Sequence, residues 1–179
     1  MARYDYQNLL KRLRDNEPGT KKKVFIAPRS AFETLSKPAA NPANAGDHLR
    51  IAADHVFKVG EGFTVLYTTL DTGKLLAEKI GDRDSRGKNI KFEGKHPGLY
   101  AEAAAYEDDA KNDEHIVLVE ILDGTVVQLG SDGLECDVTG TYDSSTVSGG
   151  YNGWMFLIES FGKLFFYEGA IELKPAPAP

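Results

Sequence analysis

The sequence predicts a mainly β (α+β) fold, in which two packed antiparallel β-sheets form a sandwich or barrel-like body flanked by one α-helix. Short runs of β-branched and aromatic residues recur between Gly-containing turns, which is typical of strands joined by tight connections. From residue 112 to 168 almost no helical periodicity is present. Two apolar runs, residues 116–121 and 126–129, flank Asp123-Gly124. This pattern predicts a β-hairpin with a type I′ turn.

The remaining strands follow from the same signals. Residues 74–80 also suit a helix by propensity, but seven residues between two turns favour a strand. Residues 162–163 are expected to reverse the chain between the last two strands, and the Pro, Asn and Gly content of residues 36–46 predicts a loop. The expected strands are residues 24–27, 55–59, 63–69, 74–80, 90–92, 134–142, 151–161 and 164–167.

One helix is predicted inside the body, at residues 99–111. Leu99, Ala103, Tyr106 and Ala110 fall on one helical face, and alanine is the best helix former. The small side chains on that face would let the helix lie close against a sheet.

A second, shorter helix is predicted at the N-terminus. Tyr6, Leu9, Leu10 and Leu13 recur at helical spacing, and residues 17–19 end the pattern. We therefore expect an N-terminal helical arm at residues 1–20 and a β domain at residues 21–172. Residues 173–179, rich in Pro and Ala, are expected to form a disordered tail.

Size and composition indicate one soluble globular domain of 179 residues. No run approaches the roughly 20 apolar residues that a membrane span needs, and no signal peptide is expected. The single cysteine, Cys136, excludes an internal disulfide. Its period-two spacing from Leu134 and Val138 predicts a buried side chain in the core.

Charge is distributed unevenly along the chain. Residues 1–30 hold eight Lys or Arg against three acids, whereas residues 113–179 hold eleven acids against two Lys. This asymmetry has two explanations: a solvated basic arm, or a basic segment that meets an acidic face of another copy. The run Lys21-Lys22-Lys23 is weak evidence for nucleic-acid binding.

Residues 81–87 partly match the pattern of a calcium-binding loop. Asp82, Asp84, Gly87 and Glu93 match positions of a calcium loop, but Arg86 stands where an oxygen ligand is required. The flanking segments also read as strands, so a solvated hairpin turn is the preferred interpretation.

No catalytic, cofactor-binding or metal-binding residues are predicted, and we expect a protein that is not an enzyme. The four histidines lack zinc-ligand spacing, and neither a nucleophile elbow nor a phosphate loop is present. Acidic residues are abundant, so a pair of carboxylates brought together as in a glycosidase remains an alternative. The late aromatic residues predict a sandwich core, with a sugar- or base-stacking platform around Trp154 or Tyr151 as the alternative.

From about residue 24 to 168 the sequence resembles the major tail tube protein family of long-tailed bacteriophages, which is related to the ring protein of the type VI secretion apparatus. An N-terminal helix is not expected from that resemblance. The resemblance rests on Gly60-Glu61-Gly62-Phe63, Asp71-Thr72-Gly73-Lys74, His96-Pro97-Gly98, residues 112–121, Asp123-Gly124, residues 127–130 and residues 161–162.

The resemblance implies a virion structural protein, assembled in the host bacterial cytoplasm, whose hexameric rings stack into a tube for DNA ejection. Its implied partners are other copies of itself, the tape measure, sheath or tail terminator proteins, and double-stranded DNA that passes without sequence-specific binding. No membrane and no cofactor are expected. The alternatives are a capsid decoration or other tail structural protein and, from another class, a carbohydrate-binding β-sandwich module.

Overall fold

The computed structural model describes residues 8–11 and 17–176, and it shows a mainly β fold with two packed sheets, a small third sheet and one α-helix. The predicted fold class is therefore confirmed. All ladders are antiparallel except the one between β12 and β3. The six-stranded sheet has the order β3 (Arg50–Ile51), β12 (Phe165–Tyr167), β9 (Val126–Leu129), β8 (His115–Ile121), β1 (Thr20–Pro28), β5 (Thr64–Tyr67).

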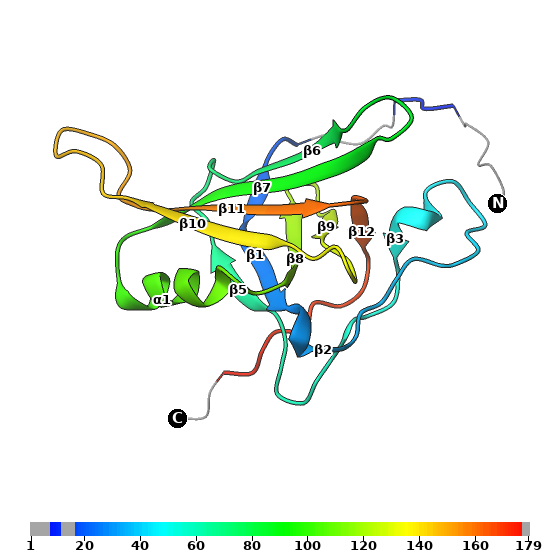
Figure 1. The fold of residues 1–179 in the computed structure, drawn as a ribbon, viewed down its shortest axis with the longest axis horizontal. Helices are drawn as coiled ribbons and strands as arrows, with labels where there is room; N and C mark the ends of the chain where they lie inside the picture. Colours follow the sequence, from blue (N-terminus) through cyan, green and yellow to red (C-terminus); the bar gives the residue numbers. More distant parts are fainter. Residues whose placement is uncertain (1–7, 12–16, 177–179) are drawn as a thin grey trace.

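The four-stranded sheet has the order β10 (Asp137–Asp143), β11 (Gly153–Phe161), β7 (Gly87–Pro97), β6 (Lys74–Ile80). Its strands cross those of the six-stranded sheet at a steep angle (Figure 1), as in orthogonal sandwiches. A two-stranded sheet of β2 (Phe32–Thr34) and β4 (Val56–Phe57) and two 3₁₀ turns, Arg29–Ala31 and Asp47–Leu49, complete the regular structure.

Strand β8 is buried on both faces, which explains its continuous apolar sequence. Val117 and Val119 face the main core between the two large sheets, where they join Phe92, Phe156 and Ile158. The alternate residues of β8 belong to a second cluster on the opposite face of the six-stranded sheet. That second cluster consists of Ala27, Phe32, Leu35, Ile51, Phe63, Ile116, Leu118 and Tyr167.

The internal helix α1 (Ala101–Ala110) confirms the helix prediction but begins two residues later. Ala103 and Ala110 are buried in the main core, while Leu99 precedes the helix and is exposed. A Cβ added to Gly140 of β10 would lie 2.5 Å from Cγ of Glu107, so the helix can approach this sheet only because position 140 has no side chain. The prediction placed the small residues on the helix, where Ala103 and Ala110 are buried, but the small residue that allows this close contact is in the sheet.

The hairpin around Asp123-Gly124 is present, but its turn is not type I′. Only Gly124 has a positive φ, of 86°, and its N–H donates to the carbonyl oxygen of Ile121. The N–H of Ile121 donates to Thr125 across a three-residue loop. This is the pattern of a type I turn with a glycine bulge, which needs one left-handed residue instead of two.

The predicted hairpin between residues 151–161 and 164–167 is wrong. Strands β11 and β12 are consecutive in sequence but lie in different sheets, and β12 pairs with β9 and β3 instead. Residues 162–164 therefore carry the chain from one sheet to the other. The strand predicted at residues 55–59 is shorter, covering Val56–Phe57.

Most of the predicted N-terminal helix lies outside the described residues. Residues 8–11 are described and are not helical. Strand β1 begins at Thr20, one residue before the predicted boundary of the β domain. None of the described helices is long and apolar enough to cross a membrane.

Candidate interaction surfaces

The calcium-loop residues do not converge on one point. Residues 81–86 form the exposed tip of the β6–β7 hairpin, while Glu93 is paired with Lys74 at the other end of that hairpin. Among the described residues, no group of three or more His, Cys, Asp or Glu is placed to hold a metal ion. The tip is a turn, with Asp84 and Gly81 at positive φ.

Two of the four histidines, His55 and His115, and the thiol of Cys136 are buried. Nε2 of His55 donates to Oε1 of Gln128 at 2.9 Å, and its Nδ1 accepts the N–H of Ser36 at 3.1 Å. Burial lowers the pKa of both His55 and His115, which favours their neutral forms. Cys136 is buried as predicted, and this burial raises the pKa of its thiol, so it is a poor nucleophile.

The two aromatic residues of the alternative stacking platform, Trp154 and Tyr151, differ in how far their rings are covered. Trp154 is only 8% exposed and packs between Tyr142 and Phe156 in the main core. Tyr151 has the ammonium group of Lys95 over its ring, 5.1 Å from the centroid. The ring of Trp154 is therefore not open to a flat carbohydrate ring, and one face of the Tyr151 ring is covered by Lys95.

The outer edges of the four-stranded sheet are the most prominent unpaired features of the fold. Strands β6 and β10 are the two edges, and each is seven residues long. Within the described part of the chain, no further strand pairs with either edge. Such edges are templates for another strand, because their outward N–H and C=O groups lack partners in a ladder.

The directions of these two edge strands are opposite. Each of the three ladders in the sheet is antiparallel, so β10 and β6 run in opposite directions across four strands. When two copies lie side by side in the same orientation, β6 of one copy and β10 of the next are therefore antiparallel. An antiparallel pair is the more stable kind of ladder per residue.

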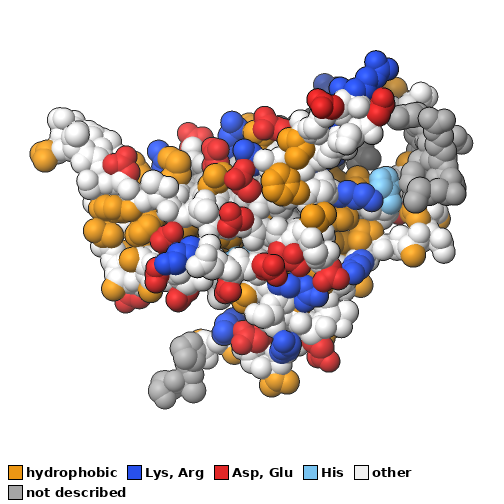
Figure 2. Space-filling model, in the orientation of Figure 1, with side chains coloured by type: hydrophobic (Ala, Val, Ile, Leu, Met, Phe, Trp, Pro, Cys, Tyr) orange, Lys and Arg blue, Asp and Glu red, His pale blue; other side chains and the backbone are white. Residues whose placement is uncertain are grey.

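The outer face of the four-stranded sheet is solvent-exposed and carries both acidic and basic side chains. Figure 2 shows acidic, basic and apolar side chains interspersed over these strands. Lys91 and Glu159 form an ion pair at 2.9 Å across β7 and β11. The register places five acids and three lysines on this face: Glu78, Glu93, Asp137, Asp143, Glu159, Lys74, Lys91 and Lys95.

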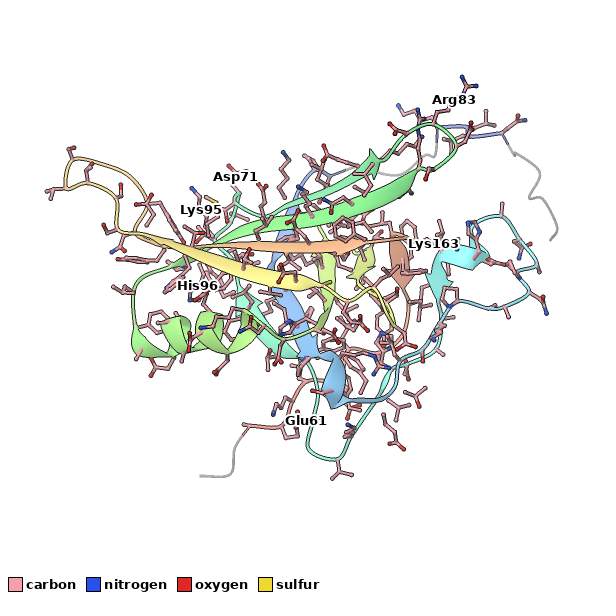
Figure 3. The ribbon with its side chains drawn as sticks, in the orientation of Figure 1. Glu61, Asp71, Arg83, Lys95, His96 and Lys163 are labelled. Atoms are coloured by element: carbon pink, nitrogen blue, oxygen red, sulfur yellow. The ribbon has the colours of Figure 1, made fainter. Side chains whose placement is uncertain are left out.

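A groove lined by cations lies near the tip of the β6–β7 hairpin. Its charged lining residues are Lys79, Arg86, Lys88 and Lys163, and we call it the basic groove. Lys79 is directly opposite Lys88 in the ladder. Figure 3 shows Arg83 at the hairpin tip and Lys163 at the same end of the molecule.

Residues 102–114, which include most of α1, form an acidic segment. They hold six acids and one lysine, Lys111, which pairs with Asp108. In Figure 1, α1 runs from the left half of the view towards the centre, whereas the β6–β7 hairpin tip is at the upper right. The C-terminal part of the segment lies beside the start of β10, where His115 is bridged to Cys136.

Sequence reasoning did not identify which strands form the edges of the four-stranded sheet. It also missed the basic groove, because Lys163 and the hairpin cations are about 80 residues apart in sequence. The alternation of charges along residues 74–95 was the available signal for an exposed sheet face.

Comparisons with protein-family models, with curated proteins and with solved structures returned no match for this chain.

Proposed function

We propose that this protein is a structural subunit that assembles with copies of itself into rings, and that the rings stack into a tube such as a bacteriophage tail tube. The observation that carries the proposal is the pair of equal-length, oppositely directed edges of the four-stranded sheet, which no strand of the described residues covers. Joining β6 of one copy to β10 of the next is a heterologous contact, which closes into a ring under cyclic symmetry.

The side chains support one register for this junction. With full overlap, Ala77 lies opposite Gly140, and outward residues of β6 meet outward residues of β10. Lys74 then lies opposite Asp143, and Leu75 lies opposite Tyr142. Both pairs are favourable across an antiparallel ladder. A shift by one residue would place outward side chains against core-facing ones.

The dimensions support a conduit. Six copies, the number that the sequence resemblance implies, would contribute four strands each to a continuous barrel. At about 4.8 Å per strand its circumference is roughly 115 Å before strand tilt, which gives a diameter of about 37 Å. Barrels of about 16–18 strands already leave an aqueous channel.

Charge supports passage of DNA without retention. If the outer face of the four-stranded sheet lines the barrel, its five acids and three lysines give each copy a net negative lining. Affinity for duplex DNA comes largely from phosphate neutralisation by Lys and Arg, so such a lining holds phosphates weakly.

Disulfide cross-linking tests the junction. Leu76→Cys combined with Thr141→Cys places thiols opposite each other between copies, at a Cα separation of about 5 Å, which a disulfide tolerates. Within one copy the ladders align Leu76 with Asp137, four residues from Thr141, so the two positions are about 20 Å apart and cannot react internally. The native Cys136 is buried and should not form a disulfide under these conditions.

The expected result is an oxidised ladder of multimers that ends at a closed ring, together with rings and tubes in negative-stain micrographs. The control Leu76→Cys/Asp137→Cys moves one thiol four residues along β10 and should not cross-link. Monomers at high concentration would overturn the proposal, and a sugar-dependent melting temperature would then favour the carbohydrate-binding module. Small discrete oligomers without rings would favour a capsid decoration or other tail structural protein.

A further inference from the structure

The second half of β6 is open to solvent on the core side of the four-stranded sheet, the side that faces the main core. Ala77 and Lys79 turn towards this side, which Ile90, the ladder partner of Ala77, also faces. Ile90 is fully buried, whereas Ala77 and Lys79 are exposed. At the other edge of the sheet, α1 packs on the core side of β10, against Gly140. One edge therefore carries a helix on its core side, and the other has room for one.

Lys79 places an uncompensated charge on this open side. It lies directly opposite Lys88 in the β6–β7 ladder, and such a pair of like charges destabilises the ladder. Arg86 and Lys163 line the same basic groove. Within the described residues, none of these four cations forms a salt bridge. The open side of β6 therefore favours an anionic partner.

The C-terminal half of α1 carries unmatched negative charge. Glu107, Asp108 and Asp109 lie in this half, and the last turn of the helix contains no basic residue. Lys111, at the C-cap, pairs with Asp108. Within the described part of the chain, Glu107 forms no salt bridge. Because the C-terminal end of a helix dipole is itself negative, a cation from outside the helix would be stabilised here.

Glu107 lies on the flank of α1 that is nearer to the outer edge of the sheet. Its Cγ would be 2.5 Å from a Cβ added to Gly140, which is in the edge strand β10. The ring of the preceding residue, Tyr106, packs edge-on against Phe156 of β11, one strand further into the sheet. Glu107 is only half-buried. It is therefore placed where a strand added to β10 would come close to it.

The proposed junction brings Lys79 and Glu107 together. With full overlap of β6 and β10, Lys79 lies opposite Val138 and diagonal to Gly140. Diagonal neighbours are roughly 7–8 Å apart, which a lysine side chain can span. Within one copy the ladders align Lys74 with Thr139, so Lys79 is about 24 Å from Gly140. The two charges can therefore meet only between neighbouring copies.

We infer that Lys79 of one copy forms an ion pair with Glu107 of α1 in the neighbouring copy of the same ring, on the core side of the β6–β10 junction. The inference rests on the proposed ring and adds a contact that the backbone ladder does not supply. Ala77 and Gly140, which lie opposite each other in the junction, suit this contact because such small residues leave space for the helix. Complementary charges at this point would also disfavour wrong partners.

Chemical cross-linking tests the contact in the unmodified chain. A carbodiimide couples an amine to a carboxylate that touches it, so the assembled protein should yield an amide between Lys79 and Glu107. Mass spectrometry of the peptides identifies this link. A mixture of isotope-labelled and unlabelled protein shows that the two peptides come from different copies. This test does not depend on the folding of any variant.

Charge reversal tests the same pair through the stability of the ring. Lys79→Glu and Glu107→Lys each place like charges at the junction, and the double variant Lys79→Glu/Glu107→Lys restores an opposite pair in the reverse order. Lys22→Glu, at an exposed lysine of β1, is the control because it changes the net charge as Lys79→Glu does. Thermal unfolding shows that each variant is folded, and sedimentation velocity gives the protein concentration at which half of the chains are in rings.

Each single reversal should raise this concentration about tenfold, while the double variant and the control should stay close to the wild type. The Leu76→Cys/Thr141→Cys disulfide, added to each variant, reports the backbone ladder separately.

Rings that form equally well in all variants would overturn the inference and leave the ring in place. The same conclusion would follow from a double variant as weak as the single ones, or from a wild-type protein in which the carbodiimide links Glu107 only to Lys111. Wild-type protein that forms neither rings nor the disulfide would remove the proposed function and this inference together.

Discussion

Nε2 of His55 lies 2.9 Å from Oε1 of Gln128 in the buried interior, while Nδ1 of the same ring accepts the N–H of Ser36. One ring nitrogen donates and the other accepts, so the neutral Nε2–H tautomer fits this pocket. Protonation would place a second N–H against the N–H of Ser36, at the start of the loop over residues 36–46.

Acid should therefore destabilise the protein through His55. Burial lowers the pKa of His55 below its usual value, with Gln128 and Asp54 opposing in part. The unfolded chain then binds the proton more readily than the folded chain. The free energy of unfolding should be flat above about pH 6.5 and fall as the pH drops towards the folded pKa.

Melting temperatures measured between pH 8 and pH 5 check this expectation. His115, whose pKa is also lowered by burial, contributes in the same direction. A His55→Gln variant should thus have a lower melting temperature at pH 8 but a shallower pH slope. An unchanged slope in that variant would contradict the role assigned to His55.

Gly140→Ala should loosen the contact between α1 and the four-stranded sheet. The new Cβ would lie 2.5 Å from Cγ of Glu107 and 3.1 Å from Cε1 of Phe156, so the helix or the core must shift. Overpacking of this kind costs about 1–3 kcal/mol. Urea unfolding measures the loss. Gly87→Ala is the control, because its nearest atom is 3.7 Å away, and it should change stability little.

Gly124→Ala tests the corrected turn. Gly124 has a φ of 86°, and a Cβ added there would meet no atom within 4 Å. The cost of an alanine would therefore come from its backbone conformation and not from a clash with neighbouring residues. An alanine there should cost about 1–2 kcal/mol in the free energy of unfolding. Gly124→Asn should cost less, because asparagine tolerates the left-handed region. Equal stability of the alanine variant and the wild type would refute the observed turn geometry.

The carboxyl of Asp132 should have an unusually low pKa. Lys37, and then Arg29, lower the pKa of its carboxyl to about 2. Any stability from these pairs is present above the unfolded pKa of Asp and is lost as the pH falls towards 2. NMR titration of the carboxyl measures the value directly, and Lys37→Gln should raise it. Because the pairs are exposed, solvent screening keeps their effect on melting small.

Local signals predicted several elements well. Strand β6 matches the expected residues 74–80, and α1 lies within the expected residues 99–111. These elements are bounded by turn residues, so their limits are encoded nearby. The turn type at Gly124 was missed because Asp-Gly suits both a type I′ turn and a type I turn with a glycine bulge.

Which strands pair, and which edges stay free, depended on contacts between distant residues. Phe165 and Phe166 were expected to turn back on β11, yet they pair with Gln128 and Val127 of β9. The residues of a tight turn determine a hairpin locally. When the chain crosses from one sheet to another, the position of the next strand depends instead on which side chains of the two sheets become buried. In β12, Tyr167 is buried with Ile51 and Phe63 in the second cluster. The residues next to Tyr167 in the sequence do not predict this burial.

The sequence by itself determined the mainly β class, the internal helix, the β8–β9 and β6–β7 hairpins and the burial of Cys136, because turn chemistry and side-chain periodicity are local properties. Only the tertiary structure decided that β6 and β10 are the two edges of one sheet, and that Lys79 faces Lys88 beside Lys163. Edges and grooves arise when distant segments pack, and packing is governed by shape and burial across the whole chain.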